Sequence, residues 1–335
     1  MTTSLRLGLV GCGAVAEHYH LPAIIATPGV RLVACADTVV GRAAELARHT
    51  GAAVYGNHGD LIPHVDAVIV TVPNAGHAAV TIALLNAGIH VLVEKPMARS
   101  SEECHEMIAA AARSGATLAV GHDFRQFPIA RCARALFQDD LLGAVCRVDV
   151  RQSAGSRWPA RTNSALSVSA GGGALLTFGV HLLDLLLWWL GDLEPVAYSD
   201  DAAGGVEAEC VARLALTATG APVDLTVSRR RALRDTTIVE CERGTLEIGI
   251  HQPAIFRLRP RSGSLAIEGS VEEAAFARAP LRAAFERQLR DFMDAIRHQQ
   301  PPLTTGADGQ RVVALIEACY ARWQPLHLPW ESRAG

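Results

Sequence analysis

The chain has 335 residues, of which 50% are hydrophobic, and its formal net charge is −3 at pH 7. This length is sufficient for two domains. The balanced charge excludes the basic footprint of a nucleic-acid-binding protein and the polyacidic tail of some interaction proteins.

The first predicted element is a buried strand at 5–10 that leads into a glycine-rich turn, GCGAVA at 11–16. In this G-x-G-x-x-A pattern Gly11 allows the tight turn, Gly13 leaves room for a pyrophosphate, and Ala16 lets the helix pack close to the strand. The free N–H groups of the helix that follows would face the phosphates. The residues predicted to bind a dinucleotide here are Gly11, Gly13, Ala14, Val15 and Ala16.

A second apolar run at 31–36 ends in Asp37. An acid at this spacing after the glycine turn holds the ribose hydroxyls of NAD. Its charge would repel the 2′-phosphate of NADP, and no arginine directly follows it, so NAD is predicted as the cofactor and NADP is disfavoured. An α/β turn without a ligand is the alternative, because the glycine pattern alone is common.

Strands and helices alternate in this part of the chain. Further strands are predicted at 53–55, 66–72, 90–94 and 116–121, and helices at 41–49, 75–87 and 100–115. This pattern predicts an α/β fold with an N-terminal Rossmann domain at 1–122, whose parallel doubly wound sheet is buried on both faces. Ligands bind at the carboxyl ends of such strands. The features that fall there are the glycine turn, Asp37, Pro73-Asn74 and Glu94-Lys95-Pro96.

Beyond residue 122 the pattern changes. Helices are predicted at 126–137, 174–190, 281–299 and 308–323, and strands at 143–152, 209–218, 222–230, 235–242, 244–250 and 254–259. Consecutive strands without intervening helices predict an antiparallel sheet in an α+β C-terminal domain at 123–335. The basic run at 229–231 is expected to be a solvated strand end rather than a phosphate site.

Two places in the sequence could carry chemistry. Lys95 leaves a strand at the crevice, where its ammonium group could bind a substrate hydroxyl and favour the ionised form; a surface lysine is the alternative. On the helix at 174–190, Thr177, His181 and Asp184 are four and three residues apart and share one face. An imidazole beside an acid suits proton transfer, although a core histidine satisfied by Asp184 fits the same spacing.

In combination these motifs resemble the glucose–fructose oxidoreductase / inositol dehydrogenase / MocA family over nearly the whole chain. The resemblance implies an NAD(H)-dependent oxidoreductase that transfers a hydride between nicotinamide and a sugar, a cyclitol, or a related polyol or keto-sugar. It also implies a C-terminal domain whose open, largely antiparallel sheet forms a homo-oligomer, a dimer or a tetramer. The resemblance rests on GCGAVA (11–16), Asp37, VPNAGH (72–77), VEKP (93–96), GHDFR (121–125) and GGGALLTFGVHLLD (171–184).

The resemblance also implies the roles of individual residues. Lys95 and His181 would be the catalytic pair, with support from Thr177 and Asp184. The substrate would contact Lys95, Arg125, Thr177 and His181, and no metal is expected. Besides the glycine turn and Asp37, the cofactor would contact Val72, Pro73, Asn74, His77, Glu94, Lys95 and Pro96, with Asn74, Glu94 and Lys95 near the nicotinamide.

Position 177 departs from the family pattern. Polyol-oxidising members commonly carry an aspartate four residues before the histidine, whereas this chain has Thr177. A hydroxyl cannot stabilise an imidazolium by charge, so the substitution is compatible with a branch that reduces a keto-sugar. The motifs also fit a branch that uses NAD transiently in glycoside hydrolysis and a nucleotide-binding regulator without chemistry. The presence of both Lys95 and His181 disfavours the regulator.

The eight cysteines are scattered and form no C-x-x-C pair. This scatter argues against a zinc site or a disulfide framework and for a reducing cytoplasm. The first residues show no leader pattern, and no apolar stretch reaches the roughly 18–20 residues of a membrane span. A cytoplasmic location is therefore expected, with a small-molecule substrate and no membrane or nucleic-acid partner.

Overall fold

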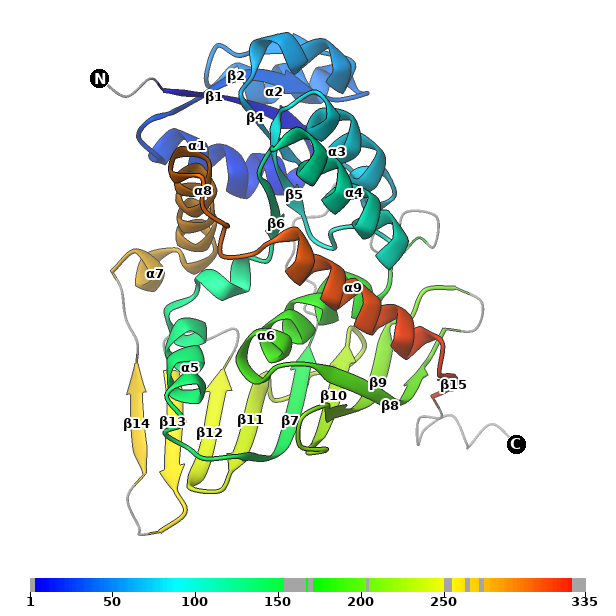
Figure 1. Ribbon diagram of the computed structural model, residues 1–335, viewed down its shortest axis with the longest axis vertical. Helices are drawn as coiled ribbons and strands as arrows, with labels where there is room; N and C mark the ends of the chain where they lie inside the picture. Colours follow the sequence, from blue (N-terminus) through cyan, green and yellow to red (C-terminus); the bar gives the residue numbers. More distant parts are fainter. Residues whose placement is uncertain are drawn as a thin grey trace. The chain divides into compact units, whose positions relative to one another are not determined.

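The computed structural model describes residues 4–153, 167, 171–202, 205–249, 255–262, 266–270 and 274–326. These residues divide into two compact units (Figure 1). The first contains the described residues up to Gln126 together with Arg278–Val313, and the second contains the rest. One unit has a parallel sheet and the other a mostly antiparallel sheet, which confirms the predicted fold class.

The first unit is built on a six-stranded parallel sheet in the order β3-β2-β1-β4-β5-β6. β1 pairs with β2 on one side and with β4 on the other. The strand order therefore reverses at β1, and sheets of this kind bind ligands outside the carboxyl ends of the strands at such a point. The strands are β1 (Leu5–Val10), β2 (Val30–Ala36), β3 (Ala53–Tyr55), β4 (Ala67–Val70), β5 (His90–Glu94) and β6 (Leu118–Gly121).

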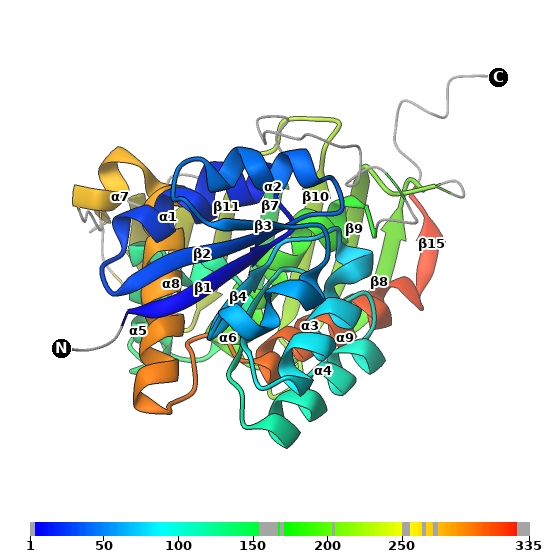
Figure 2. The same cartoon turned by 90° about the horizontal axis from the view of Figure 1, so that it is seen from above.

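Helices cover both faces of this sheet (Figure 2). α3 (His77–Asn86) and α4 (Ser101–Ser114) contribute to the apolar layer on one face. The layer on the other face includes α1 (Leu21–Ala26), α2 (Val40–Ala47) and α8 (Pro280–His298). Burial on both sides explains why a strand such as β4, with the sequence AVIV, is apolar throughout.

Local signals determine where several of these elements begin. The Ser100 hydroxyl accepts the Glu103 N–H at 3.1 Å and caps α4. The helix after the glycine turn begins as a π-helical turn, Ala16–His20, before α1. Two 3₁₀ turns, η2 (His58–His64) and η3 (Asn74–Gly76), precede β4 and α3.

The second unit is built on a nine-stranded sheet in the order β14-β13-β12-β11-β7-β10-β9-β8-β15. β7 with β10 and β8 with β15 are parallel pairs, and the other neighbours are antiparallel. The sequence did not predict β8, whose pairing is irregular near Pro195, or the short β14, β15 and α7. The elements are β7 (Val145–Ser153), β8 (Leu193–Asp200), β9 (Glu209–Leu216), β10 (Pro222–Ser228), β11 (Thr236–Cys241), β12 (Gly244–Gly249), β13 (Ile255–Pro260), β14 (Ile267–Ser270), β15 (Trp323–Pro325) and α7 (Ala274–Arg278).

The two faces of the second sheet differ in polarity. α5 (Pro128–Gln138) and α6 (Val180–Leu190) lie on one face, and Trp189 Nε1 donates to the Ala130 carbonyl at 2.9 Å to join them (Figure 1). Alternate strand positions carry charged pairs between strands, such as Arg147 with Asp224 at 2.7 Å. The strands therefore alternate between buried apolar and partly exposed polar positions. The remaining helix, α9, spans Gly306–Tyr320.

Three further observations concern the described ranges alone. None of their helices combines the length and the apolar character that crossing a bilayer requires. No group of three or more histidine, cysteine or acidic side chains among the same residues could hold a metal ion. The eight cysteines are all free thiols.

Candidate active site

The glycine turn links the carboxyl end of β1 to those of β2 and β4. The Gly11 N–H donates to the Ala36 carbonyl at 2.8 Å, and the Thr71 hydroxyl donates to the Gly11 carbonyl. Gly11 has a φ of +88°, and a Cβ atom there would lie 2.6 Å from the Val72 nitrogen. Glycine is therefore required at this position both by the backbone conformation and by the close approach of the neighbouring chain.

The surroundings of Gly13 and Asp37 fit a dinucleotide. A Cβ atom at Gly13 would meet no described atom within 4 Å, which leaves the approach to the backbone open, as a pyrophosphate requires. The Asp37 carboxylate accepts the Cys12 N–H at 2.7 Å through Oδ2 and the Val39 N–H at 2.8 Å through Oδ1. These two bonds fix the acid beside the turn, at the end of β2, where a ribose hydroxyl would be bound.

His77 joins the chain segments that follow β4 and β5. Its Nδ1 lies 2.7 Å from the Pro96 carbonyl and its Nε2 lies 2.9 Å from the Val72 carbonyl, and the residue is buried. A neutral imidazole can donate to only one of these carbonyls, whereas an imidazolium can donate to both. Burial lowers the pKa of His77 and outweighs the two carbonyls and Glu94, which act to raise it. Both ring nitrogens of His77 therefore face carbonyl groups of the protein's own backbone.

Glu94 is paired with a histidine that the sequence analysis did not single out. His20 Nε2 lies 2.8 Å from Glu94 Oε1, and both side chains are buried. Glu94 Oε2 accepts the Lys95 N–H at 3.1 Å. Burial acts to raise the pKa of Glu94, but the bond and charge of His20, with Lys95 and His77, hold that pKa below its usual value. Lys95 itself is partly buried at the end of β5.

Thr177 and His181 lie on a helix of the second unit that changes its winding between them. A π-helical turn, Leu175–Gly179, contains Thr177, and α6 begins at Val180. The Thr177 hydroxyl donates to the Gly173 carbonyl and accepts from Arg229 Nη2 at 2.7 Å. His181 is 6% exposed and its ring packs on Phe178, with the centroids 6.0 Å apart. Asp184, one turn further, is fully buried.

Glu207 caps the start of this helix, although no sequence pattern indicated this role. Its Oε1 accepts the Leu175 N–H at 2.9 Å and the Tyr320 hydroxyl at 3.0 Å. A side chain on Gly173, which has a φ of +118°, would overlap the Glu207 carboxylate. Neither Glu207 nor Arg229 is adjacent to the helix in sequence, so no local spacing could have revealed them.

Arg125, predicted to contact the substrate, is 1% exposed and takes part in an ion pair of the first unit whose acid is partly exposed. Its Nη2 lies 3.2 Å from Asp308 Oδ1 and its Nη1 donates to the Leu303 carbonyl at 3.2 Å. Burial acts to raise the pKa of Asp308, but Arg125 and Thr305 outweigh it and hold that pKa below its usual value. These bonds give Arg125 a structural role, and its contact with the substrate stays a prediction.

The sequence matches two family models. Residues 5–122 match a model described as an oxidoreductase family with an NAD-binding Rossmann fold. Residues 130–247 match a model described as the GFO/IDH/MocA C-terminal domain. Each match falls on one of the two sheets described above, and together they cover most of the chain.

Several curated proteins are similar in sequence. The chain is 33% identical to a 1,5-anhydro-D-fructose reductase from Ensifer adhaerens over 60% of this chain and 62% of that protein. It is 32% identical to a D-glucoside 3-dehydrogenase from Escherichia coli over 57% of this chain and 56% of that protein. These two matches span less than two thirds of the relatives' own length. An inositol 2-dehydrogenase from Saccharopolyspora erythraea is 27% identical over 94% of this chain and 92% of its own.

Solved structures share the fold. A 3-ketoreductase from Actinomadura kijaniata, in complex with NADP and TDP-benzene, has a TM-score of 0.84 at 23% identity, covering 98% of this chain and all of that one. A dehydrogenase from Bordetella pertussis, in complex with NADH and UDP-GlcNAcA, has a TM-score of 0.81 at 22% identity, covering 96% and 95% of the two chains. At these identities the likeness establishes the fold alone.

Proposed function

We propose that this chain, which belongs to the Gfo/Idh/MocA family of oxidoreductases, interconverts an alcohol and a carbonyl group on a sugar, a cyclitol or a related polyol. The observation that carries the proposal is the group of residues at the carboxyl ends of β1, β2, β4 and β5, where the open approach to Gly13 adjoins the fixed Asp37 carboxylate. A nicotinamide cofactor, when bound, accepts or supplies the hydride.

The residues around the glycine turn would hold the cofactor, and Asp37 would select NAD over NADP. Both carboxylate oxygens of Asp37 are anchored by backbone N–H groups, so the negative charge cannot easily move aside for a 2′-phosphate. Val72, Pro73 and Asn74 follow β4, and Glu94, Lys95 and Pro96 end β5 or follow it. His77 ties these two segments together and would fix the edge of the cofactor site.

Lys95 and His181 would perform the proton chemistry. In the direction of alcohol oxidation, a ring nitrogen of neutral His181 takes the hydroxyl proton and the Lys95 ammonium group stabilises the developing negative charge on oxygen. In the reverse direction, protonated His181 returns the proton to the carbonyl oxygen. Thr177 and Asp184, one turn before and one turn after His181, would support its orientation. The support for these roles is the family membership together with the position of each residue.

The experiment that tests this function is a panel of sugars, cyclitols and keto-sugars supplied with NAD⁺ or NADH and followed at the nicotinamide absorbance. The expected result is net formation or consumption of NADH with at least one member of the panel, and loss of that turnover in the Lys95→Ala variant. Glycoside cleavage without net NADH formation would replace this function with a transient use of the cofactor. Binding of NADH without any turnover would favour a regulator.

We also propose that the protein is a homo-oligomer assembled through the nine-stranded sheet of the second unit. The proposal is supported by the extent of this sheet, whose polar face carries charged pairs such as Arg257 with Glu268 at 2.9 Å, and by the family resemblance. Light scattering at micromolar protein concentration should give the mass of a dimer or a tetramer, and the mass of a monomer would contradict the proposal.

A further inference from the structure

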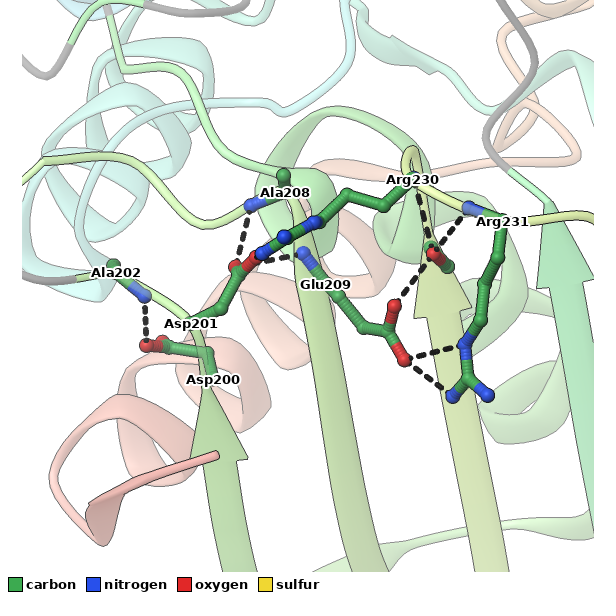
Figure 3. Close-up of polar contacts among 8 residues, drawn as sticks. Asp200, Asp201, Ala202, Ala208, Glu209, Arg230 and Arg231 are labelled. Atoms are coloured by element: carbon green, nitrogen blue, oxygen red, sulfur yellow. Dashed lines mark hydrogen bonds and ion pairs between the residues drawn. The ribbon is translucent and has the colours of Figure 1, made fainter. Parts of the chain in front are cut away.

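The basic run at 229–231 follows β10, and two of its three arginines are neutralised there (Figure 3). Arg230 Nη1 lies 3.0 Å from Asp201 Oδ2, and Arg231 Nε donates to Glu209 Oε1 at 2.8 Å. The side chains of these acids are only 7% and 0% exposed. Asp201 also accepts two backbone N–H groups through Oδ1. The strand end that the sequence predicts is therefore a set of ion pairs.

Arg229 has a different environment. Its Nη2 donates to the Thr177 hydroxyl, a neutral acceptor, at 2.7 Å. Within the described ranges, Arg229 forms no ion pair with a carboxylate, and its Nε is buried without a hydrogen-bond partner. Burial lowers the pKa of Arg229, and the charge of Glu207 opposes this effect. A guanidinium group nevertheless stays protonated in a protein, so Arg229 carries a positive charge into a partly buried place.

The charge of Glu207 acts on Arg229, but within the described ranges the two side chains form no ion pair. Glu207 Oε1 already accepts the Leu175 N–H at 2.9 Å and the Tyr320 hydroxyl at 3.0 Å. Burial also raises the pKa of Glu207, which acts against its ionised form. A partly desolvated cation whose direct partner is a hydroxyl is an incomplete arrangement, because buried charges are ordinarily paired.

The position of Arg229 places this charge on the side of the helix that carries His181. Thr177 and His181 are four residues apart, about one helical turn, and so lie on the same side. The single hydroxyl proton of Thr177 goes to the Gly173 carbonyl, which leaves its oxygen lone pairs for Arg229. The Arg229 N–H donates to the Ala208 carbonyl at 2.7 Å, so the arginine is anchored at both ends.

We propose that Arg229 binds an anionic substituent of the substrate, a carboxylate or a phosphoryl group, so that the substrate is an acidic derivative of a sugar or cyclitol rather than a neutral polyol. The proposal rests on the function proposed above. One N–H of the guanidinium serves Thr177 and the Nε–H is buried, which leaves the two N–H groups of Nη1 and the second of Nη2 for the anion. Carboxylate and phosphoryl oxygens accept paired N–H groups of arginine in charge-assisted bonds, which are stronger than bonds between neutral groups.

The test compares acidic and neutral sugars as ligands of the enzyme–NADH complex by titration calorimetry and as substrates with NAD⁺. The pairs are D-glucuronate with D-glucose and D-galacturonate with D-galactose, and D-glucose 6-phosphate supplies the phosphoryl group. At least one acidic ligand should bind about tenfold or more tightly than its neutral counterpart. Tighter binding of a uronate identifies a carboxylate site, and tighter binding of the phosphate ester identifies a phosphoryl site.

Variants then assign the preference to Arg229. Arg229→Gln should weaken binding of the acidic ligand by about tenfold to a hundredfold, the effect of removing a hydrogen bond to a charged group, and leave the neutral sugar nearly unaffected. Arg229→Lys keeps the charge but lacks the planar guanidinium group, so its affinity for the acidic ligand should lie between those of the parent and Arg229→Gln. Arg230→Gln is the matched control, because Arg230 already has Asp201 as its partner, and it should leave the preference unchanged.

The outcomes separate this proposal from the proposed function. Acids that bind through Arg229 without any turnover of NAD⁺ would uphold the anion site and overturn the hydride transfer. Neutral sugars that bind as tightly as every acid, or an Arg229→Gln variant that weakens acids and neutral sugars equally, would overturn the anion site. In that case oxidation of neutral sugars would leave the oxidoreductase function intact.

Discussion

The two sheets of this protein present their candidate functional residues in different ways. In the parallel sheet these residues directly follow strands, as the glycine turn follows β1 and Asp37 follows β2. In the mixed sheet, Thr177, Glu207 and Arg229 come from a helix, a loop and a strand end. A parallel sheet places its carboxyl ends along one edge, whereas a mixed sheet does not, so a reader of the sequence can locate only the first site from strand ends.

The first prediction, with the largest expected effect, tests whether each unit supplies one catalytic group. Lys95→Ala removes a cation and His181→Ala removes a proton carrier, and each should lower kcat by about 10²–10⁴, far more than it weakens NADH binding. If the two groups act as a unit, as proposed above, the double variant should lose less than the product of the two effects. Steady-state kinetics and NADH titration measure both quantities. Near-parental turnover in the His181→Ala variant would leave Lys95, in the first unit, as the only assigned catalytic group.

The second prediction concerns the turn after β1. Gly13→Val should abolish NADH binding, because the added side chain would occupy the path of the pyrophosphate. Gly41→Val is the matched control, since a Cβ atom at either glycine meets no described atom within 4 Å. Circular dichroism should show both variants folded, and fluorescence titration should show binding in the control only. A folded Gly13→Val variant that binds NADH like the parent would refute the cofactor site.

The third prediction compares an ion pair with a buried arginine and an exposed ion pair, both in the first unit. Asp308→Asn removes the carboxylate that the nearly inaccessible Arg125 contacts at 3.2 Å and should lower the free energy of unfolding by about 3–5 kcal/mol. Asp66→Asn breaks the exposed pair with Arg6, where the side chains are 36% and 48% exposed, and should lower it by about 0–1 kcal/mol. Urea unfolding measures both losses, and equal losses would contradict the structural role of Arg125.

The loss of stability at acidic pH gives a second test of the Arg125–Asp308 pair. The pKa of Asp308 in the folded protein lies below its usual value, because Arg125 and Thr305 outweigh the opposing effect of burial. Its ionised form therefore contributes stability above the usual pKa of aspartate, and this contribution is lost as the pH falls through the folded-state pKa. The Asp308→Asn variant should show a correspondingly shallower loss of stability with acid than the parent.

The last prediction has the smallest effect and probes the helix of the second unit. Thr177→Asp adds a negative charge one turn before His181, which favours imidazolium. Alcohol oxidation needs the neutral imidazole, so the acid limb of the pH–rate profile should move to higher pH. Arg229, which contacts position 177, would pair with the new carboxylate and keep the shift below about one pH unit. Adding Arg229→Gln to Thr177→Asp should enlarge the shift of the acid limb. A pH–rate profile that does not move in either variant would exclude His181 from the proton transfer.

Several features of the fold and site follow from local sequence. The parallel sheet could be predicted because its central strands are buried on both faces and are therefore largely apolar, as in AVIV of β4. The glycine turn could be predicted because the conformation of Gly11 and the closeness of Val72 leave no room for another residue. The capping of α4 by Ser100 could be predicted for the same kind of reason, since the bond spans only three residues.

The sequence by itself determined the elements of the parallel sheet, its strand ends and the residue types of the candidate cofactor site, because these depend on contacts within a few residues or on burial repeated along a strand. Only the tertiary structure decided that α8 returns to the first unit and that His20 pairs with Glu94. It also decided that Arg229 contacts Thr177 across 52 residues of chain. Such partners are selected by packing between distant segments, and a pairing of this kind leaves no periodicity or spacing in the sequence.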